Sequence, residues 1–137
     1  MKVKELAIGR FQVVAVVDGD KCPAEDFIVN GEISTAASRE GLLDMLEKTA
    51  QNGLHGIPAA WIHEADKQEK IYEFIKGRLR LFFFKGENGQ IAICTNGQMK
   101  KSTKADKSAI AIAAIYRKKY FKAIREGTLQ VIQNETE

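Results

Sequence analysis

The feature that most constrains the fold of this chain is a run of three strand-like segments in its second half. The segments are residues 70–75, 78–85 and 90–99. A very tight turn at Lys76-Gly77 joins the first two, and a glycine-bounded loop at residues 86–89 joins the second to the third. Because connections this short join only neighbouring antiparallel strands, the run predicts a three-stranded meander.

The middle strand of this meander presents two different faces. Successive residues of a strand point to opposite sides, so residues 78–84 divide into a set that begins with arginines and a set that is wholly apolar. The first set is Arg78, Arg80, Phe82 and Phe84, and the second is Leu79, Leu81 and Phe83. One face therefore carries charged residues at the start of the strand and aromatic residues further along. This places two cations at the N-terminal end of a buried strand.

The first half of the chain predicts one further strand and one helix. Residues 10–17 predict a strand that ends in an Asp-Gly-Asp turn, and residues 27–29 predict a short extended piece. Residues 38–52 have the three-and-four spacing of an amphipathic helix. Residues 54–65 have no clean period and predict an irregular connection that holds Trp61 against the core.

The last third of the chain predicts a helix at residues 106–125 with a strongly basic outer side. Residues 98–125 hold nine Lys or Arg and one acidic residue, although the formal net charge of the whole chain is only +3. So concentrated a positive charge favours a nucleic acid partner, while the alternative that the lysines only keep the helix soluble stays open. Beyond the helix, apolar residues 129, 131 and 132 either add an edge strand or bind a partner. The predicted core-facing stripe of the helix is Ala109, Ile112, Ala113, Tyr116 and Tyr120.

These segments predict a single α+β domain that covers residues 1–137. We expect a small antiparallel sheet of about four strands, mixed at most at its edge, with the helices packed on one face. The open face would carry Arg78 and Arg80 near the residues that follow Met99, which would make a concave cationic site.

Several classes of protein lack their sequence signatures here. No run of about 18 apolar residues and no signal-peptide pattern occurs, so we expect a cytoplasmic protein without membrane contact. Cys22 and Cys94 form no Cys-x-x-Cys pair and predict reduced, structural thiols. His55 and His63 have no partner ligands at helical spacing, and the glycine motifs of nucleotide-binding loops are absent. We therefore expect no metal and no cofactor.

Four blocks in the second half carry a family resemblance. They are Ile71-Tyr72-Glu73-Phe74, Arg80-Leu81-Phe82-Phe83-Phe84, Lys100-Lys101-Ser102-Thr103-Lys104 and Tyr116-Arg117-Lys118-Lys119-Tyr120. In this order and at about this spacing they resemble the RelE/ParE toxin superfamily, and within it the HigB or phage-derived host-inhibition branch. The likeness covers residues 53–125 well and the first 35 residues weakly. The chain departs from the branch at Ile75, where the first block would have an arginine.

The resemblance implies a RelE-like fold and a toxin of a type II toxin-antitoxin system. Such a toxin is an endoribonuclease, or mRNA interferase, that binds the ribosomal A site, cleaves messenger RNA there without a metal and so inhibits translation. Its partner would be a cognate antitoxin, commonly a helix-turn-helix protein. A ParE-like gyrase inhibitor of the same fold, and a basic module that binds RNA or DNA without cutting it, are the alternatives.

The chemistry of metal-free RNA cleavage gives roles to basic residues of these blocks. The attacking 2′-hydroxyl must lose a proton, the leaving 5′-oxygen must gain one, and the charge of the phosphorane must be stabilised. The planar fork of Arg80 suits the last role, and proton transfer is assigned to Lys100 or Lys101. We interpret Glu73 as structural, pairing with a cation across the sheet. The RNA-binding candidates are Tyr72, Lys76, Arg78, Lys104, Lys118, Lys119 and Lys122.

Overall fold

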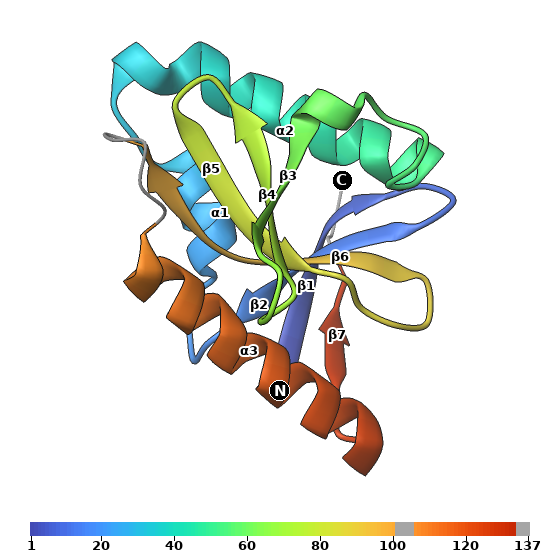
Figure 1. Ribbon diagram of the computed structural model, residues 1–137. Coiled ribbons are helices and arrows are strands. Elements are labelled where there is room, and N and C mark those ends of the chain that lie inside the picture. The colour runs from blue at the N-terminus through green and yellow to red at the C-terminus, as the bar shows by residue number, and fades with distance from the viewer. Residues whose placement is uncertain (101–105, 134–137) are drawn as a thin grey trace.

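A computed structural model describes residues 1–100 and 106–133 of the chain (Figure 1). In these two ranges the chain forms an α+β fold, and no helix there is long and apolar enough to cross a membrane. The strands are β1 (Lys2–Ile8), β2 (Gln12–Val17), β3 (Ile62–Asp66), β4 (Ile71–Lys76), β5 (Leu79–Phe84), β6 (Gln90–Met99) and β7 (Gln130–Ile132). The helices are α1 (Pro23–Val29), α2 (Ala36–Asn52) and α3 (Lys107–Glu126), with 3-10 turns at Ile33–Thr35 and Ala59–Trp61.

The sheet is larger and more mixed than the predicted four antiparallel strands, and that prediction was wrong. Among the described residues, seven strands are hydrogen-bonded in the order β3-β4-β5-β6-β2-β1-β7. The β2–β6 and β1–β7 pairs are parallel, and the other pairs are antiparallel. One additional strand, β7, is the edge strand that was one of the two alternatives for residues 129, 131 and 132. The other two lack a clear period, since β3 exposes His63 and Glu64 and β1 shifts its register between Glu5 and Ala7. Edge strands bury little apolar surface, so their sequence signal is weak.

Helices cover both faces of this sheet, not one face as predicted (Figure 1). α1 and α2 pack on the face that carries Leu81 and Phe83 of β5. α3 packs on the opposite face, over Phe82 and Phe84. Because β5 is apolar on both sides beyond Arg80, each face needs a helical cover to keep these side chains from water.

β2 joins the two halves of the sheet. Its Val13 and Ala15 lie in the core beneath α1 and α2, whereas Val14 and Val16 lie in the core beneath α3. It pairs with β1 on one side and with β6 on the other. A strand buried on both faces has a continuous apolar sequence, which is why this strand was predictable.

The meander predicted from the sequence is confirmed. β4, β5 and β6 pair in succession, and the odd-numbered residues of β5 lie beneath α2 while its even-numbered aromatic residues lie beneath α3. The tight turn begins one residue later than predicted, because Lys76 pairs with Leu79 and leaves Gly77-Arg78 as the loop. Gly77 has φ +57°, a left-handed conformation that glycine adopts at little cost in such loops.

Two local predictions were wrong. Residues 27–29 belong to α1, not to an extended piece, because Pro23 at the helix start and the acidic Glu25 and Asp26 in its first turn favour a helix. The end of the predicted irregular connection is β3, whose exposed polar residues conceal the strand. Trp61 is half-buried against the core beneath α2, as predicted.

α3 begins and ends within one residue of its predicted limits. The carboxylate of Asp106 caps the helix by accepting two backbone N–H groups of the first turn, and Gly127 at φ +69° ends it. The predicted core-facing stripe is wrong at Ile112, whose exposed fraction is 45%, whereas Ile110 is buried. The residues that α3 buries are four alanines together with Ile110 and Tyr120.

Candidate functional site

Arg80 lies near the start of β5, on the sheet face that α3 covers further along. Its Nη1 donates to the carbonyl oxygens of Gly77 at 2.8 Å and Leu79 at 3.0 Å, which ties the guanidinium to the β4–β5 turn. The side chain is 15% exposed, and its buried Nε has no hydrogen-bond partner among the described residues. A buried donor without a partner costs about 1–3 kcal/mol in folding free energy.

Glu73 faces Arg80 from the neighbouring strand β4. Its Oε1 lies 4.0 Å from Arg80 Nε and 3.2 Å from Nδ1 of His63 on β3. The Glu73 side chain is 11% exposed, whereas that of His63 is 66% exposed. The prediction that Glu73 pairs with a cation across the sheet is confirmed by its contact with Arg80. Three adjacent strands thus supply a row of imidazole, carboxylate and guanidinium groups.

Lys100 and Arg78 meet close to Arg80. The N–H of Lys100 donates to the carbonyl of Arg78 at 2.7 Å, and Arg80 is the register partner of Gln98. The end of β6 and the β4–β5 turn therefore bring basic residues to one corner of the sheet. Several cations at one corner can bind and stabilise a phosphate group. The other catalytic candidate, Lys101, and the RNA-binding candidate Lys104 lie outside the described residues.

Tyr72 and Lys76 lie on the opposite face of the sheet from Arg80. Tyr72 is half-buried in the core beneath α2, and Lys85 Nζ lies 4.7 Å from its ring centroid. The aliphatic stem of Lys76 lies against Gly41 of α2, where it would meet an added Cβ. The structure therefore does not bring these two RNA-binding candidates together with Arg80.

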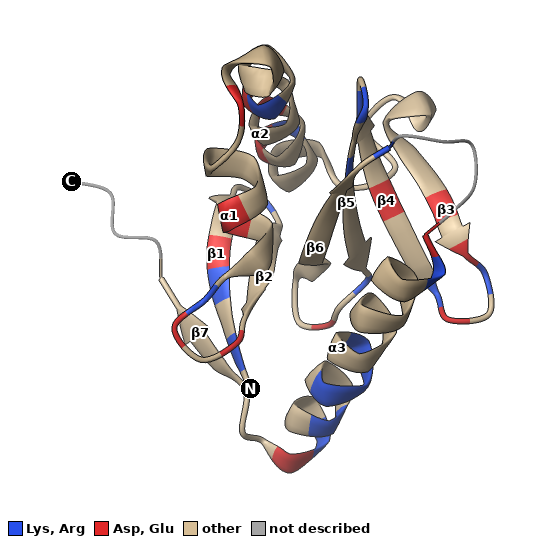
Figure 2. Cartoon of the chain, turned by 90° about the vertical axis from the view of Figure 1, so that its left-hand side faces the viewer, with Lys and Arg blue, Asp and Glu red and all other residues tan. Residues whose placement is uncertain are grey.

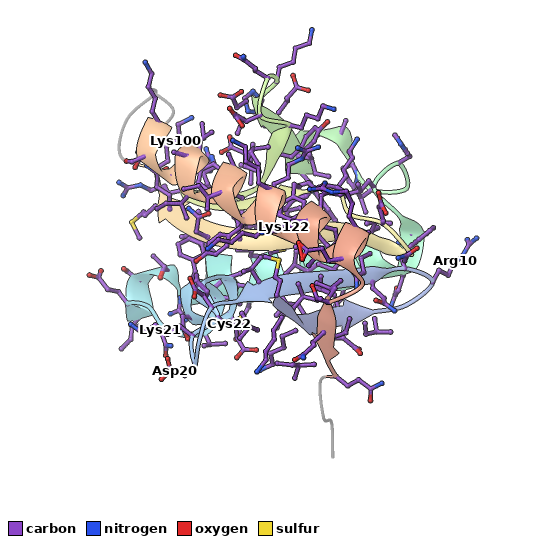
Figure 3. The ribbon with its side chains drawn as sticks, turned by 90° about the horizontal axis from the view of Figure 1, so that it is seen from below. Arg10, Asp20, Lys21, Cys22, Lys100 and Lys122 are labelled. Atoms are coloured by element: carbon purple, nitrogen blue, oxygen red, sulfur yellow. The ribbon has the colours of Figure 1, made fainter. Side chains whose placement is uncertain are left out.

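Lys118, Lys119 and Lys122 are exposed on the second half of α3. Figure 2 shows Lys and Arg gathered on this part of the helix, and Figure 3 shows Lys100 and Lys122 at separate places on the α3 side. Near the end of β6, the side chain of Asn96 donates to the carbonyl of Ala109 in the first turns of α3 at 3.2 Å. At 1.5 Å per residue, these lysines lie about 14 to 20 Å further along the helix from that point.

A hollow of about 350 Å³ lies beside this basic half of α3, and Tyr116, Lys119 and Lys122 contribute to its lining. The hydroxyl of Tyr116 donates to Asp18 Oδ2 at 2.9 Å, and burial together with this hydrogen bond raises the pKa of Tyr116. Lys122 Nζ lies 3.8 Å from Glu126 Oε1. Because carboxylates balance the lysines, the hollow is electrostatically mixed and is a poorer phosphate site than the corner at Arg80.

His63 is the member of the row that sequence reasoning missed. It was set aside because no ligand stands at helical spacing from it, but its partner Glu73 is paired with it across the β3–β4 ladder. Finding the pair required residues 62–66 to be recognised as a strand. The short span between residues 66 and 71 was the available signal, since it fits a hairpin connection.

Comparisons with known proteins supply no family for this chain. No protein-family model matches it, and no curated protein matches it.

Proposed function

We propose that this chain is a type II toxin of the RelE/ParE superfamily, near its HigB branch, and that it cleaves messenger RNA on the ribosome. The observation that carries the proposal is the corner at which a backbone hydrogen bond joins Lys100 to Arg78, next to Arg80 and the largely buried carboxylate of Glu73. The guanidinium of Arg80, which the β4–β5 turn holds in place, is the donor group proposed to bind a phosphate oxygen. The four sequence blocks add the family resemblance.

In the proposed reaction, the 2′-oxygen of one nucleotide attacks the phosphorus that follows it. The O2′–P bond forms, the P–O5′ bond breaks, and the products are a 2′,3′-cyclic phosphate and a 5′-hydroxyl. Arg80 stabilises the negative charge of the phosphorane, because a charged donor in a partly dry site binds the transition state strongly. Lys100 gives a proton to the leaving 5′-oxygen, and Arg78 holds the RNA backbone.

The basic half of α3 serves binding in this proposal, not chemistry. Lys118, Lys119 and Lys122 lie too far along the helix to reach the phosphate held by Arg80. They would contact ribosomal RNA through its backbone, and such contacts release counterions and weaken as the salt concentration rises. A cognate antitoxin of the helix-turn-helix type is the proposed neutralising partner.

The test compares cleavage on and off the ribosome. Purified protein is added to translating ribosomes and to the same messenger RNA free in solution, and the products are mapped by primer extension. We expect cuts inside the translated frame on ribosomes and a rate roughly 100-fold lower on free RNA, because the ribosome orients the substrate. Equal rates would indicate a self-sufficient nuclease, and no cleavage in either arm would overturn the proposal.

One observation favours a second candidate, a nucleic-acid-binding module that does not cleave. The cations are distributed over the strand corner, the α2 side of the sheet and the second half of α3. Such a distribution can hold an RNA backbone without directing several groups to one phosphate. If this candidate is correct, single substitutions weaken binding in small steps and no cleavage product appears.

A further inference from the structure

We infer that His63 is the base that removes the proton from the 2′-hydroxyl, and that Glu73 is the positioning residue that orients its ring. The inference rests on the proposed function and adds a residue that the family resemblance does not assign. It starts from the row formed by His63, Glu73 and Arg80 on three adjacent strands.

The contact between His63 and Glu73 determines which ring nitrogen is free. Nδ1 of His63 lies 3.2 Å from Oε1 of Glu73. An ionised carboxylate only accepts hydrogen bonds, so the ring proton is held on Nδ1 and the lone pair of the neutral imidazole is left on Nε2. His63 and Glu73 are also register partners in the β3–β4 ladder, which keeps both side chains on the same face of the sheet.

The exposure of the two residues fits different tasks. The Glu73 side chain is 11% exposed, so it is held by its surroundings and can orient a neighbour. The His63 side chain is 66% exposed, so an RNA strand can reach its ring. The charged groups that the contacts place by the imidazole are Glu73 from β4, with Arg80 of β5 behind it, whereas Glu64 on its own strand pairs with Tyr72 and points to the other face.

The imidazole and the guanidinium are close enough to act on one phosphodiester. Glu73 Oε1 lies 3.2 Å from His63 Nδ1 and 4.0 Å from Arg80 Nε, so the two nitrogens are at most about 7.2 Å apart. A base must come within about 3 Å of the proton that it removes, and an arginine within a similar distance of the oxygen that it stabilises. Both of these nitrogens face Glu73, and the base Nε2 lies one ring width beyond Nδ1. The 2′-hydroxyl is therefore placed at Nε2 and a phosphate oxygen at the exposed part of the Arg80 guanidinium, within the span of one phosphodiester.

Imidazole suits the first proton transfer better than an amine does. An unperturbed histidine has a pKa of about 6.5 and is mostly neutral at pH 7.5, whereas an unperturbed lysine, at about 10.4, is protonated and fit to act as an acid. The balanced step is then complete. His63 Nε2 takes the 2′-hydroxyl proton as the O2′–P bond forms, and Lys100 gives a proton to O5′ as the P–O5′ bond breaks.

The experiment uses the two histidines of the chain as a matched pair. His63→Gln and His55→Gln are each assayed for single-turnover cleavage of ribosome-bound messenger RNA, for ribosome binding and for the melting temperature. We expect His63→Gln to lower the cleavage rate by about 100-fold or more, with binding and melting unchanged, and His55→Gln to behave as the wild type. Glu73→Gln should lower the rate by less.

The pH dependence of the rate is the readout that a structural role would not change. The wild-type rate should fall on acidification, because a protonated imidazole cannot take a proton, and His63→Gln should lose this dependence. A His63→Gln enzyme with the wild-type rate and pH profile would overturn the inference and leave the proposed function intact. A wild-type protein that cleaves nothing on the ribosome would overturn both.

Discussion

The backbone N–H of Lys100 donates to the carbonyl of Arg78 at 2.7 Å, so the end of β6 is tied to the β4–β5 turn. This bond extends the β5–β6 ladder beyond its last register pair, Leu79 and Met99. It holds two basic residues from separate connections next to each other. An anion that both side chains reach would be attracted by both charges.

Replacement of Arg80 by alanine should remove most of the proposed catalysis. The loss of one donor to the transition state lowers rates by about 100-fold or more. The measurement is single-turnover cleavage on ribosomes, together with growth arrest on expression. Because Arg80 also holds the β4–β5 turn, the melting temperature of the Arg80→Ala protein is measured as well.

The control for Arg80 is Arg10→Ala, which removes an exposed arginine in the β1–β2 loop, seen at the periphery in Figure 3. It should leave cleavage and growth arrest unchanged. An Arg80→Ala protein that is folded and as toxic as the wild type would remove Arg80 from the mechanism. Arg80→Lys tests the planar fork, because it keeps the charge and loses the paired donors.

Replacement of Lys118, Lys119 and Lys122 together by glutamine should weaken ribosome binding and flatten its salt dependence. Each lost phosphate contact reduces the slope of log affinity against log salt by about 0.7 to 0.9. The rate of cleavage of already bound messenger RNA should remain close to that of the wild type. Binding is measured over a salt series, and the control replaces Lys21, Lys48 and Lys67, which are exposed elsewhere. A similar loss in both triple mutants would show that total charge, not its position on α3, governs binding.

Tyr120→Phe should destabilise the fold. The fully buried hydroxyl donates to Gln90 Oε1 at 2.6 Å and accepts the N–H of Glu87 at 3.2 Å, and burial raises the pKa of Tyr120. Removing it leaves these groups without their partner, at a cost of about 1–3 kcal/mol in the free energy of unfolding measured with urea. Tyr116→Phe, which loses a more exposed hydrogen bond to Asp18, should cost less. Equal losses would contradict this assignment.

The N-cap of α3 should make part of the stability depend on pH. Hydrogen bonds from Ser108 and Ala109 lower the pKa of Asp106 below its usual value of 3.8. A carboxylate with a lowered pKa in the folded state contributes stability above its unfolded pKa, and loses it as the pH falls through the folded pKa. Asp106→Asn keeps a capping oxygen but cannot titrate. The free energies of unfolding of the wild type and Asp106→Asn, measured from pH 7 to pH 3, should therefore converge as the pH falls. A difference that stays constant over this range would contradict the prediction.

The parts of the fold that the sequence predicted are those whose signals are local. The meander follows from two short connections and from the alternation along β5, and α3 follows from its apolar stripe between Asp106 and Gly127. The parallel β2–β6 and β1–β7 pairs have no local signal, because the paired residues are distant in the chain. The second helical layer was missed for a different reason. The sequence shows that both faces of β5 are apolar, but helices were predicted to pack on only one of them.

The candidate site was predicted in part. Arg80 and its partner Glu73 were identified, whereas His63 required the β3–β4 register. That Tyr72 and Lys76 lie on the opposite face of the sheet from Arg80 could have been predicted from the sequence. In both the predicted and the observed turn, alternation across β4 and β5 puts Tyr72 and Lys76 on the face opposite Arg80.

The parallel pairing of β2 with β6 also governs how this chain behaves during its own synthesis. β2 ends at Val17, and its last partner on β6 is Cys94, so about 77 residues must be added before the pair can form. At about 5–20 residues per second, this takes about 4 to 15 s. Throughout that interval β2 is paired with β1 but lacks β6 on its other side, and its valines lack a complete helical cover. Nascent chains are therefore at risk of aggregation, and a chaperone that shields residues 12–17 would raise the yield of folded protein.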